Sequence, residues 1–344
     1  MKICALIMAG GIGSRFWPQS TPNKPKQFLK LIGDKTMLQM TYDRMSKLIP
    51  EEDIFIVTNK DYKKIVKEQI SGVSDVNIIC EPFGKNTAPC ILLSSLYLKN
   101  LYGNVNIVCV ASDSYIKDED AFLNKIKLAS DFVAKENNAI VTLGITPNRP
   151  EIGYGYIKFE DDNNDIKKVL EFKEKPNLET AIKYLESGKY LWNAGMFIFN
   201  NLNMLEELKV NLSNEYDLLS NLPNWNDNNF DSFLDTNYAK CEKISIDYAV
   251  MEKSNSVYTI PSDIGWDDVG TWASLTRYIE KDENNNIIKG NVKVINSHDN
   301  IVYCNGKKII LKDIDDIYCI DSDSVIVIGK KENINDVYNL GKEE

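Results

Sequence analysis

The feature that most constrains the fold is the alternation of short apolar runs with amphipathic stretches in the first half of the chain. The apolar runs predict strands at residues 3–8, 54–58, 76–80, 106–111 and 139–143. The stretches between them predict helices at residues 37–47, 62–70, 87–101 and 121–135. This order is typical of a doubly wound, mostly parallel α/β sheet. Such sheets bind ligands at the carboxyl ends of their strands.

The mixed pattern continues beyond residue 151 without a clear break, so we expect one catalytic domain over residues 1–284. The remainder, residues 285–344, consists of short β-branched runs at 292–295, 301–303, 309–311 and 325–328, separated by Gly, Asn and Asp. This composition predicts a small, all-β second domain. Its acidic residues lack the spacing of a calcium loop, so we interpret them as solvated turns.

Composition excludes several function classes. The net charge of −10 argues against a nucleic-acid or anionic-membrane partner. The single histidine, His298, has no motif around it, which excludes a Ser-His-Asp triad and a multi-histidine metal site. The seven cysteines show no C-x-x-C spacing. No apolar run approaches the ~20 residues of a membrane span, and no signal peptide is recognisable, so we expect a cytoplasmic protein.

A glycine-rich turn, AGGIGSRFWP at residues 9–18, directly follows the first expected strand. Glycines let the backbone approach a phosphate closely and present successive N–H groups to it. The turn is neither a P-loop nor a dinucleotide fingerprint, because Phe16 stands where the latter has its third glycine. Residues 1–33 contain no acid, and among their cations Arg15 and Lys26 are suited to hold a polyphosphate. A basic surface stretch is the alternative interpretation.

Seven ordered motifs extend this observation along the chain. The turn is followed by PKQFL at 25–29, and the others are EPFGKNTAP at 81–89, RPEIGYGYI at 149–157, FKEKP at 172–176, WNAGMF at 192–197, SIDYAVME at 245–252 and GWDDVGTW at 265–272. Together they resemble the signature of the sugar-nucleotide pyrophosphorylases, and most closely the members that make GDP-mannose.

The resemblance implies a nucleotidyltransferase reaction. GMP would pass from GTP to α-D-mannose 1-phosphate, giving GDP-mannose and pyrophosphate for polysaccharide biosynthesis. The sugar phosphate would attack the α-phosphate in line, assisted by Mg²⁺. The resemblance further implies the nucleotidyltransferase fold with a short left-handed β-helix at the C-terminus, and a homo-oligomer, expected to be a dimer. Two alternatives stay open: a catalytically silent nucleotide-sugar sensor of the same fold, and a hexose-1-phosphate nucleotidyltransferase of other base or sugar specificity.

The resemblance also assigns roles to individual residues. The implied catalytic residues are Arg15, Lys26, Asp113 and Asp267, of which the two aspartates would be the Mg²⁺ ligands. The nucleotide would contact Ala9, Gly10, Gly11, Gly13, Ser14, Arg15, Lys26, Glu81, Asn86, Thr87 and Ser112. The sugar phosphate would contact Gly155, Tyr156, Glu174, Lys175, Asn193 and Gly195. The chain departs from the family pattern at Ser114, Ala194, Ile152 and Lys85, which leaves the base and hexose specificity open.

Overall fold

The computed structural model describes residues 1–11 and 13–341. It divides into two compact units. Unit 1 comprises Met1–Gly10 and Thr41–Trp266, and unit 2 comprises Gly11–Met40 and Asp267–Glu344. Two elements, α1 (Met37–Ser46) and β11 (Trp266–Asp267), lie across the boundary between the units. The domain boundary expected between residues 284 and 285 stays a prediction.

Unit 1 is built on a nine-stranded sheet with the order β3-β2-β1-β4-β9-β6-β10-β8-β7. Its strands are β1 (Ile3–Met8), β2 (Ile54–Asn59), β3 (Ile78–Glu81), β4 (Asn106–Ala111), β6 (Ile140–Ile145), β7 (Tyr156–Phe159), β8 (Lys167–Lys173), β9 (Tyr190–Asn200) and β10 (Val257–Ser262). A further short strand is β5 (Tyr115–Ile116), and the α-helices of this unit are α2 (Lys63–Gln69), α3 (Thr87–Tyr102), α4 (Glu119–Lys135), α5 (Leu178–Ser187), α6 (Asn201–Asn211), α7 (Ser213–Leu219) and α8 (Phe230–Asn237).

The five strands and four helices expected in the first half are confirmed: two of the strands match to the residue, and the other elements differ by one or two residues at their ends. The expectation of a mostly parallel sheet holds only for part of it. Strands β3, β2, β1 and β4 are parallel neighbours. The long strand β9 then runs antiparallel to both β4 and β6, and β7 and β8 pair antiparallel. The sheet is therefore mixed, because β9 and the β7–β8 hairpin, which lie within residues 156–200, join it with antiparallel pairings.

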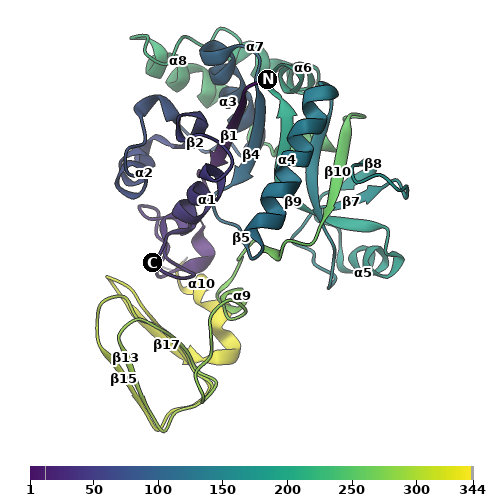
Figure 1. Cartoon of the computed structure of the whole chain (residues 1–344). Helices are drawn as coiled ribbons and strands as arrows, with labels where there is room; N and C mark the ends of the chain where they lie inside the picture. Colours follow the sequence, from purple (N-terminus) through teal and green to yellow (C-terminus); the bar gives the residue numbers. More distant parts are fainter. Residues whose placement is uncertain (12, 342–344) are drawn as a thin grey trace. The chain divides into compact units, whose positions relative to one another are not determined.

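Helices cover both faces of this sheet. Alternate side chains of the central strands, such as Leu6, Ile107 and Phe199, share one core cluster with side chains of α3 and α6. The residues between them, such as Ile7 and Val108, are equally buried and point to the opposite face. On that face α4 contacts β4, β6, β9 and β10, and Figure 1 shows it running along the sheet.

Unit 2 contains the glycine-rich segment and the C-terminal strands. Its elements are the 3₁₀ turns η1 (Ser14–Phe16) and η2 (Lys26–Phe28), the helices α9 (Trp272–Leu275) and α10 (Val337–Leu340), the 3₁₀ helix η8 (Lys331–Asp336), and the strands β12 (Ile287–Lys289), β13 (Val292–Ile295), β14 (Ile301–Tyr303), β15 (Ile309–Lys312), β16 (Ile317–Asp321) and β17 (Ile326–Lys330). The expected β-rich C-terminal region is thus confirmed.

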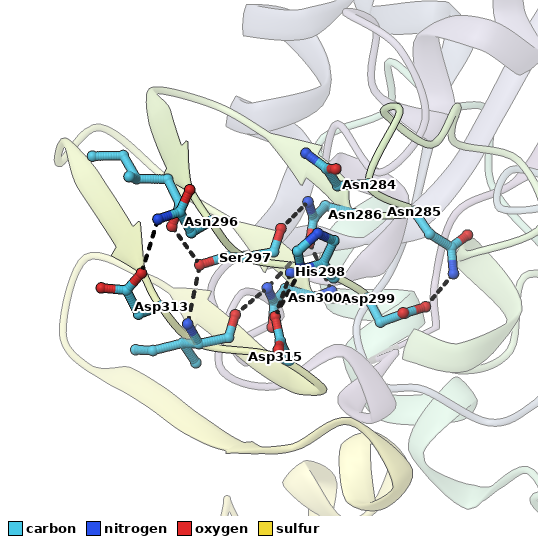
Figure 2. Close-up of polar contacts among 12 residues, drawn as sticks. Asn284, Asn285, Asn286, Asn296, Ser297, His298, Asp299, Asn300, Asp313 and Asp315 are labelled. Carbon is cyan, nitrogen blue, oxygen red and sulfur yellow. Dashed lines mark hydrogen bonds and ion pairs between the residues drawn. The ribbon is translucent and has the colours of Figure 1, made fainter.

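The C-terminal strands stack in parallel, β12 on β14 on β16 and β13 on β15. Asparagine side chains connect the layers (Figure 2): Asn300 Nδ2 donates to Asn286 Oδ1 at 3.1 Å, and Asn286 Nδ2 donates to the Ser297 carbonyl. The stacked layers are offset by 14 residues at Asn286–Asn300 and by 17 at Asn300–Ile317. The unequal lengths explain why no strict repeat is visible in the sequence.

Candidate active site

In unit 1, the carboxyl ends of β1 and β4 lie side by side. The Ser112 N–H donates to the Met8 carbonyl at 3.0 Å, and the Thr58 hydroxyl donates to the Ala9 carbonyl at 2.8 Å. Asp113 follows Ser112 and is half-buried. The parallel strands thus bring together Ala9, Ser112 and Asp113 where the fold class predicts a ligand.

The loop after β3 contributes Glu81, Asn86 and Thr87. The Glu81 side chain is buried and accepts a hydrogen bond from the Tyr238 hydroxyl. Burial raises the pKa of Glu81 to about 7, while the Tyr238 hydrogen bond acts in the opposite direction. A Cβ added to Gly10 would lie 3.1 Å from Glu81 Oε2, so the missing side chain lets the first strand approach this carboxyl group closely.

Asn86 and Thr87 begin α3. Asn86 has a φ of 70°, and its side chain accepts from the Thr87 N–H at 2.8 Å. The Thr87 hydroxyl oxygen in turn accepts the Ile246 N–H at 2.8 Å. Lys85, one of the departures from the family pattern, donates to the Ala239 carbonyl at 2.7 Å. The loop is therefore anchored to the segment that contains Tyr238 and Ile246.

The residues expected at the sugar phosphate form a polar cluster in unit 1. Lys175 Nζ lies 2.7 Å from Glu174 Oε1, and Lys175 has a φ of 46°. A Cβ on Gly155 would lie 2.5 Å from Glu174 Oε2 and 3.3 Å from Asn193 Cβ, so only glycine leaves room for both side chains. Gly195 donates its N–H to Asn193 Oδ1 at 3.1 Å. Five of the six expected residues thus share one neighbourhood.

The sixth, Tyr156, has a fully buried side chain. Its hydroxyl oxygen accepts the Glu151 N–H at 3.0 Å, so the ring supports the loop that carries Gly155. Ser114 and Ala194 are buried as well, whereas Ile152 is exposed.

In unit 2, the glycine-rich segment packs against residues 267–272. The Lys26 side chain is buried and donates to the Asp268 carbonyl at 2.6 Å. A Cβ on Gly270 would lie 3.3 Å from Arg15 Nη1, and Trp272 Nε1 donates to the Trp17 carbonyl. Two cations thus lie against one short segment, which is suited to an anionic ligand.

The turn itself depends on Gly13, which has a φ of 59° and leaves no room for a Cβ beside Lys26. Gly11 accepts a hydrogen bond from Gln27 Nε2 through its carbonyl. Ser14 starts η1, which places Arg15 one residue into the turn.

Asp267 is buried in unit 2 with both carboxylate oxygens in hydrogen bonds. Oδ1 accepts the Val269 N–H at 2.7 Å, and Oδ2 accepts from Arg277 Nη1 at 2.6 Å. Val269 has a φ of 47°, which is rare for a β-branched residue and is typical of strained functional segments.

Asp113, in unit 1, and Asp267, in unit 2, are the two residues expected from the sequence as metal ligands. Within the ranges 1–11 and 13–341, no three His, Cys, Asp or Glu side chains gather so that they could hold an ion alone. One or two carboxylates completed by phosphate oxygens and water are what Mg²⁺ uses in nucleotide sites. Each of the two carboxylates is therefore chemically suited to Mg²⁺ that arrives with a nucleotide.

Comparison with known proteins identifies the family. A model of the nucleotidyl transferase family matches residues 4–285. The chain belongs to this family. Among relatives of this nucleotidyl transferase, a Salmonella montevideo mannose-1-phosphate guanylyltransferase is 38% identical over 98% of the chain and 73% of the relative. The alginate biosynthesis protein AlgA of Pseudomonas putida is 36% identical over 98% of the chain and 70% of the relative.

Solved structures of related proteins share the fold of this chain. A Thermus thermophilus structure described as mannose-1-phosphate geranyltransferase superposes with a TM-score of 0.87 at 28% identity, covering 100% of this chain and 99% of that one. A UDP-glucose pyrophosphorylase shares the fold at a TM-score of 0.52 and 16% identity, over 81% and 97% of the two chains. Among the described residues, no helix of this nucleotidyl transferase is both long and apolar enough to cross a membrane.

Several residues around the site carried no predicted role. Tyr238 and Arg277 hold Glu81 and Asp267, respectively, and both lie outside the sequence motifs. Asp247 and Glu252 contact Asn193 and Glu174, and they belong to the SIDYAVME motif. The motif was therefore the available sequence signal for Asp247 and Glu252, whereas no sequence signal pointed to Tyr238 and Arg277.

Proposed function

We propose that this nucleotidyl transferase transfers GMP from GTP to α-D-mannose 1-phosphate, releasing pyrophosphate and forming GDP-mannose. The observation that carries the proposal is the approach of Arg15 and Lys26 to residues 268–270 of unit 2, which suits a triphosphate. Guanine and mannose are proposed on the near-full-length similarity to relatives that are named mannose-1-phosphate guanylyltransferase.

The reaction needs no side chain as nucleophile or base. The phosphate oxygen of the sugar phosphate is already ionised near neutral pH, so catalysis requires alignment and neutralisation of charge. Arg15 and Lys26 would hold the triphosphate, together with backbone N–H groups of Gly11, Gly13 and Ser14. Lys175, whose ammonium group is paired with Glu174, would hold the attacking phosphate.

Asp113 and Asp267 are the proposed ligands of Mg²⁺, which when bound neutralises phosphate charge and favours departure of pyrophosphate. Glu81 would accept hydrogen bonds from the N1–H and amino group of guanine, with Asn86 and Thr87 lining the same loop. Glu174 and Asn193 would recognise sugar hydroxyls beside the Gly155 backbone. Ala9, Gly10 and Ser112 would border the nucleoside.

A homo-oligomer, expected to be a dimer, stays part of the proposal. The C-terminal β-rich region of unit 2 exposes several apolar side chains, Ile310, Ile314, Ile326 and Ile328. Exposed β-branched residues on an edge strand such as β17 favour pairing with another copy. Light scattering combined with size-exclusion chromatography measures the oligomer directly, and a monomer at micromolar concentration would contradict it.

The test of the proposed function is pyrophosphate release with Mg²⁺ for every pairing of GTP, ATP, UTP and dTTP with mannose, glucose and galactose 1-phosphate. We expect the GTP and mannose 1-phosphate pair to be the fastest. Preference for another pair would keep the reaction and change the specificity. Tight binding of a nucleotide sugar without turnover of any pair would identify a sensor instead.

A further inference from the structure

One sequence motif, residues 245–252, has no role in the reaction as proposed so far. In the structure it forms a single π-helical turn, η7 (Asp247–Met251), close to the sugar cluster of unit 1. π-Helical turns are rare and occur frequently at functional sites. The side chain at the start of this turn, Asp247, contacts a residue of the sugar cluster.

Asp247 determines the orientation of the Asn193 amide. Asn193 Nδ2 donates to Asp247 Oδ1 at 2.9 Å. On the other side of the amide, Asn193 Oδ1 accepts from Thr142 Oγ1 at 3.2 Å and from the Gly195 N–H at 3.1 Å. Rotating the amide by half a turn would point its oxygen at a carboxylate and its NH₂ at the Gly195 N–H. The three contacts therefore select one orientation.

The same motif also connects to both binding loops. The Ile246 N–H donates to Thr87 Oγ1 at 2.8 Å, on the side of the nucleotide loop. Glu252 Oε1 accepts the Glu174 N–H at 3.1 Å, on the side of the sugar cluster. Asp247 lies between these two anchors in the sequence, so its position is determined by both loops.

We propose that Asp247 is a positioning residue for sugar recognition, which fixes the Asn193 amide so that its second N–H is presented to a hydroxyl of the hexose. This inference rests on the proposed function, because it assigns Asn193 to the sugar. An amide N–H in a fixed direction discriminates between hexoses that differ in the orientation of one hydroxyl. Asp247 thereby affects the binding of mannose 1-phosphate and leaves the binding of GTP unchanged.

The charges around Asp247 make its role dependent on pH. Burial and then the Glu174 carboxylate raise the pKa of Asp247 to about 6, whereas Lys175 and the Asn193 hydrogen bond act in the opposite direction. An ionised carboxylate accepts the Asn193 N–H more strongly than a protonated one. The positioning should therefore weaken as the pH falls below about 6.

The test compares Asp247→Ala and Asp247→Asn with the wild-type chain. For Asp247→Ala we expect the KM for mannose 1-phosphate to rise about tenfold, as for one lost hydrogen bond to a charged group, while the KM for GTP stays within about twofold. Asp247→Asn keeps the shape and an acceptor oxygen, so its effect should be smaller. It also provides the measurement if the alanine variant does not fold.

The pH profile separates positioning from a general structural role. The KM for mannose 1-phosphate of the wild type, divided by that of Asp247→Asn, should rise as the pH falls from 7.5 to 5.5, and this ratio cancels ionisation of the substrate phosphate. Asp53→Asn, which removes a buried carboxylate paired with Lys2 outside the site, is the control. The KM of the wild type divided by that of Asp53→Asn should stay constant over the same pH range.

Three outcomes would overturn the inference. Equal increases of both KM values in Asp247→Ala would indicate a general loss of structure, and a flat wild-type ratio would contradict positioning by the ionised carboxylate. In either case an active wild-type enzyme leaves the proposed function intact. A wild-type chain that does not turn over GTP with mannose 1-phosphate overturns both proposals together.

Discussion

Arg277 Nη1 lies 2.6 Å from Asp267 Oδ2, and this ion pair joins a buried carboxylate to a half-exposed guanidinium. The carboxylate is also the proposed ligand of Mg²⁺. Arginine and metal would therefore share one acceptor group. Because the guanidinium is partly solvated, it can move aside at little cost, and it keeps the buried charge of Asp267 compensated when no metal is bound.

Arg277→Gln should reveal whether the arginine and Mg²⁺ share the Asp267 carboxylate. Without Mg²⁺, we expect the free energy of unfolding to fall by about 1 kcal/mol, since Asp267 loses a charge-assisted hydrogen bond. Mg²⁺ should restore stability more in the variant than in the wild type, because the ion replaces the missing positive charge. Chemical unfolding in the presence of GTP, with and without Mg²⁺, measures both effects, and Arg277→Lys serves as the control that keeps the charge. An identical response to Mg²⁺ in all three proteins would refute Asp267 as a ligand.

The expected elements were the part most accessible from sequence. Runs such as residues 3–8 and 106–111 are apolar throughout because both faces of a central strand are buried, and their bounds were predicted to the residue. The antiparallel course of β9 was not predictable. Strand direction depends on long-range pairing with β4 and β6, and no local pattern encodes it.

In the candidate site, too, some features were predictable from the sequence and others were not. Glycines that the backbone requires, such as Gly13 and Gly155, stand out within motifs. The groups that hold the polar side chains are spread along the chain, and Tyr238 reaches Glu81 across 157 residues. A buried tyrosine in a region without a motif looks like any core residue. Its role emerges only when packing brings it to a carboxyl group.

Two glycines of the nucleotide turn should respond differently to alanine. At Gly13 the φ of 59° and the overlap with Lys26 both oppose a side chain, so Gly13→Ala should raise the KM for GTP by more than tenfold and destabilise the chain by about 1–2 kcal/mol. At Gly11 a Cβ has no protein atom within 4 Å, which makes Gly11→Ala the matched control for stability. Steady-state kinetics with varied GTP test Gly13→Ala, and thermal unfolding compares the two variants. Equal destabilisation of the two variants would contradict the structure of the turn.

The sugar cluster offers a second matched pair. An added Cβ at Gly155 would lie 2.5 Å from Glu174 Oε2, so Gly155→Ala must displace that carboxylate. We expect the KM for mannose 1-phosphate to rise about tenfold or more, with the KM for GTP nearly unchanged. At Gly153 the nearest atom is 3.4 Å away, and Gly153→Ala should behave like the wild type. An effect of Gly155→Ala on GTP alone would place the sugar elsewhere.

The buried Glu81 predicts a dependence of stability on pH. Burial raises its pKa from 4.5 to about 7 in the folded chain. Between these values the folded state binds more protons at Glu81 than the unfolded state, so the contribution of Glu81 to stability falls as the pH rises from about 4.5 to 7 and is constant above. Glu81→Gln keeps the acceptor for the Tyr238 hydroxyl and removes the charge.

Relative to the wild type, Glu81→Gln should therefore gain stability between pH 5 and pH 8, by on the order of 1 kcal/mol or more. Urea unfolding at both pH values measures this gain. Glu215→Gln, which alters another buried glutamate that accepts a backbone N–H, controls for the loss of a buried carboxylate as such. The variant should also bind GTP less tightly at pH 8, because an amide cannot accept from both N1–H and the amino group of guanine as a carboxylate does. A stability difference that is the same at both pH values would mean that Glu81 is ionised throughout, and the carboxylate would then be solvated rather than enclosed beside Tyr238.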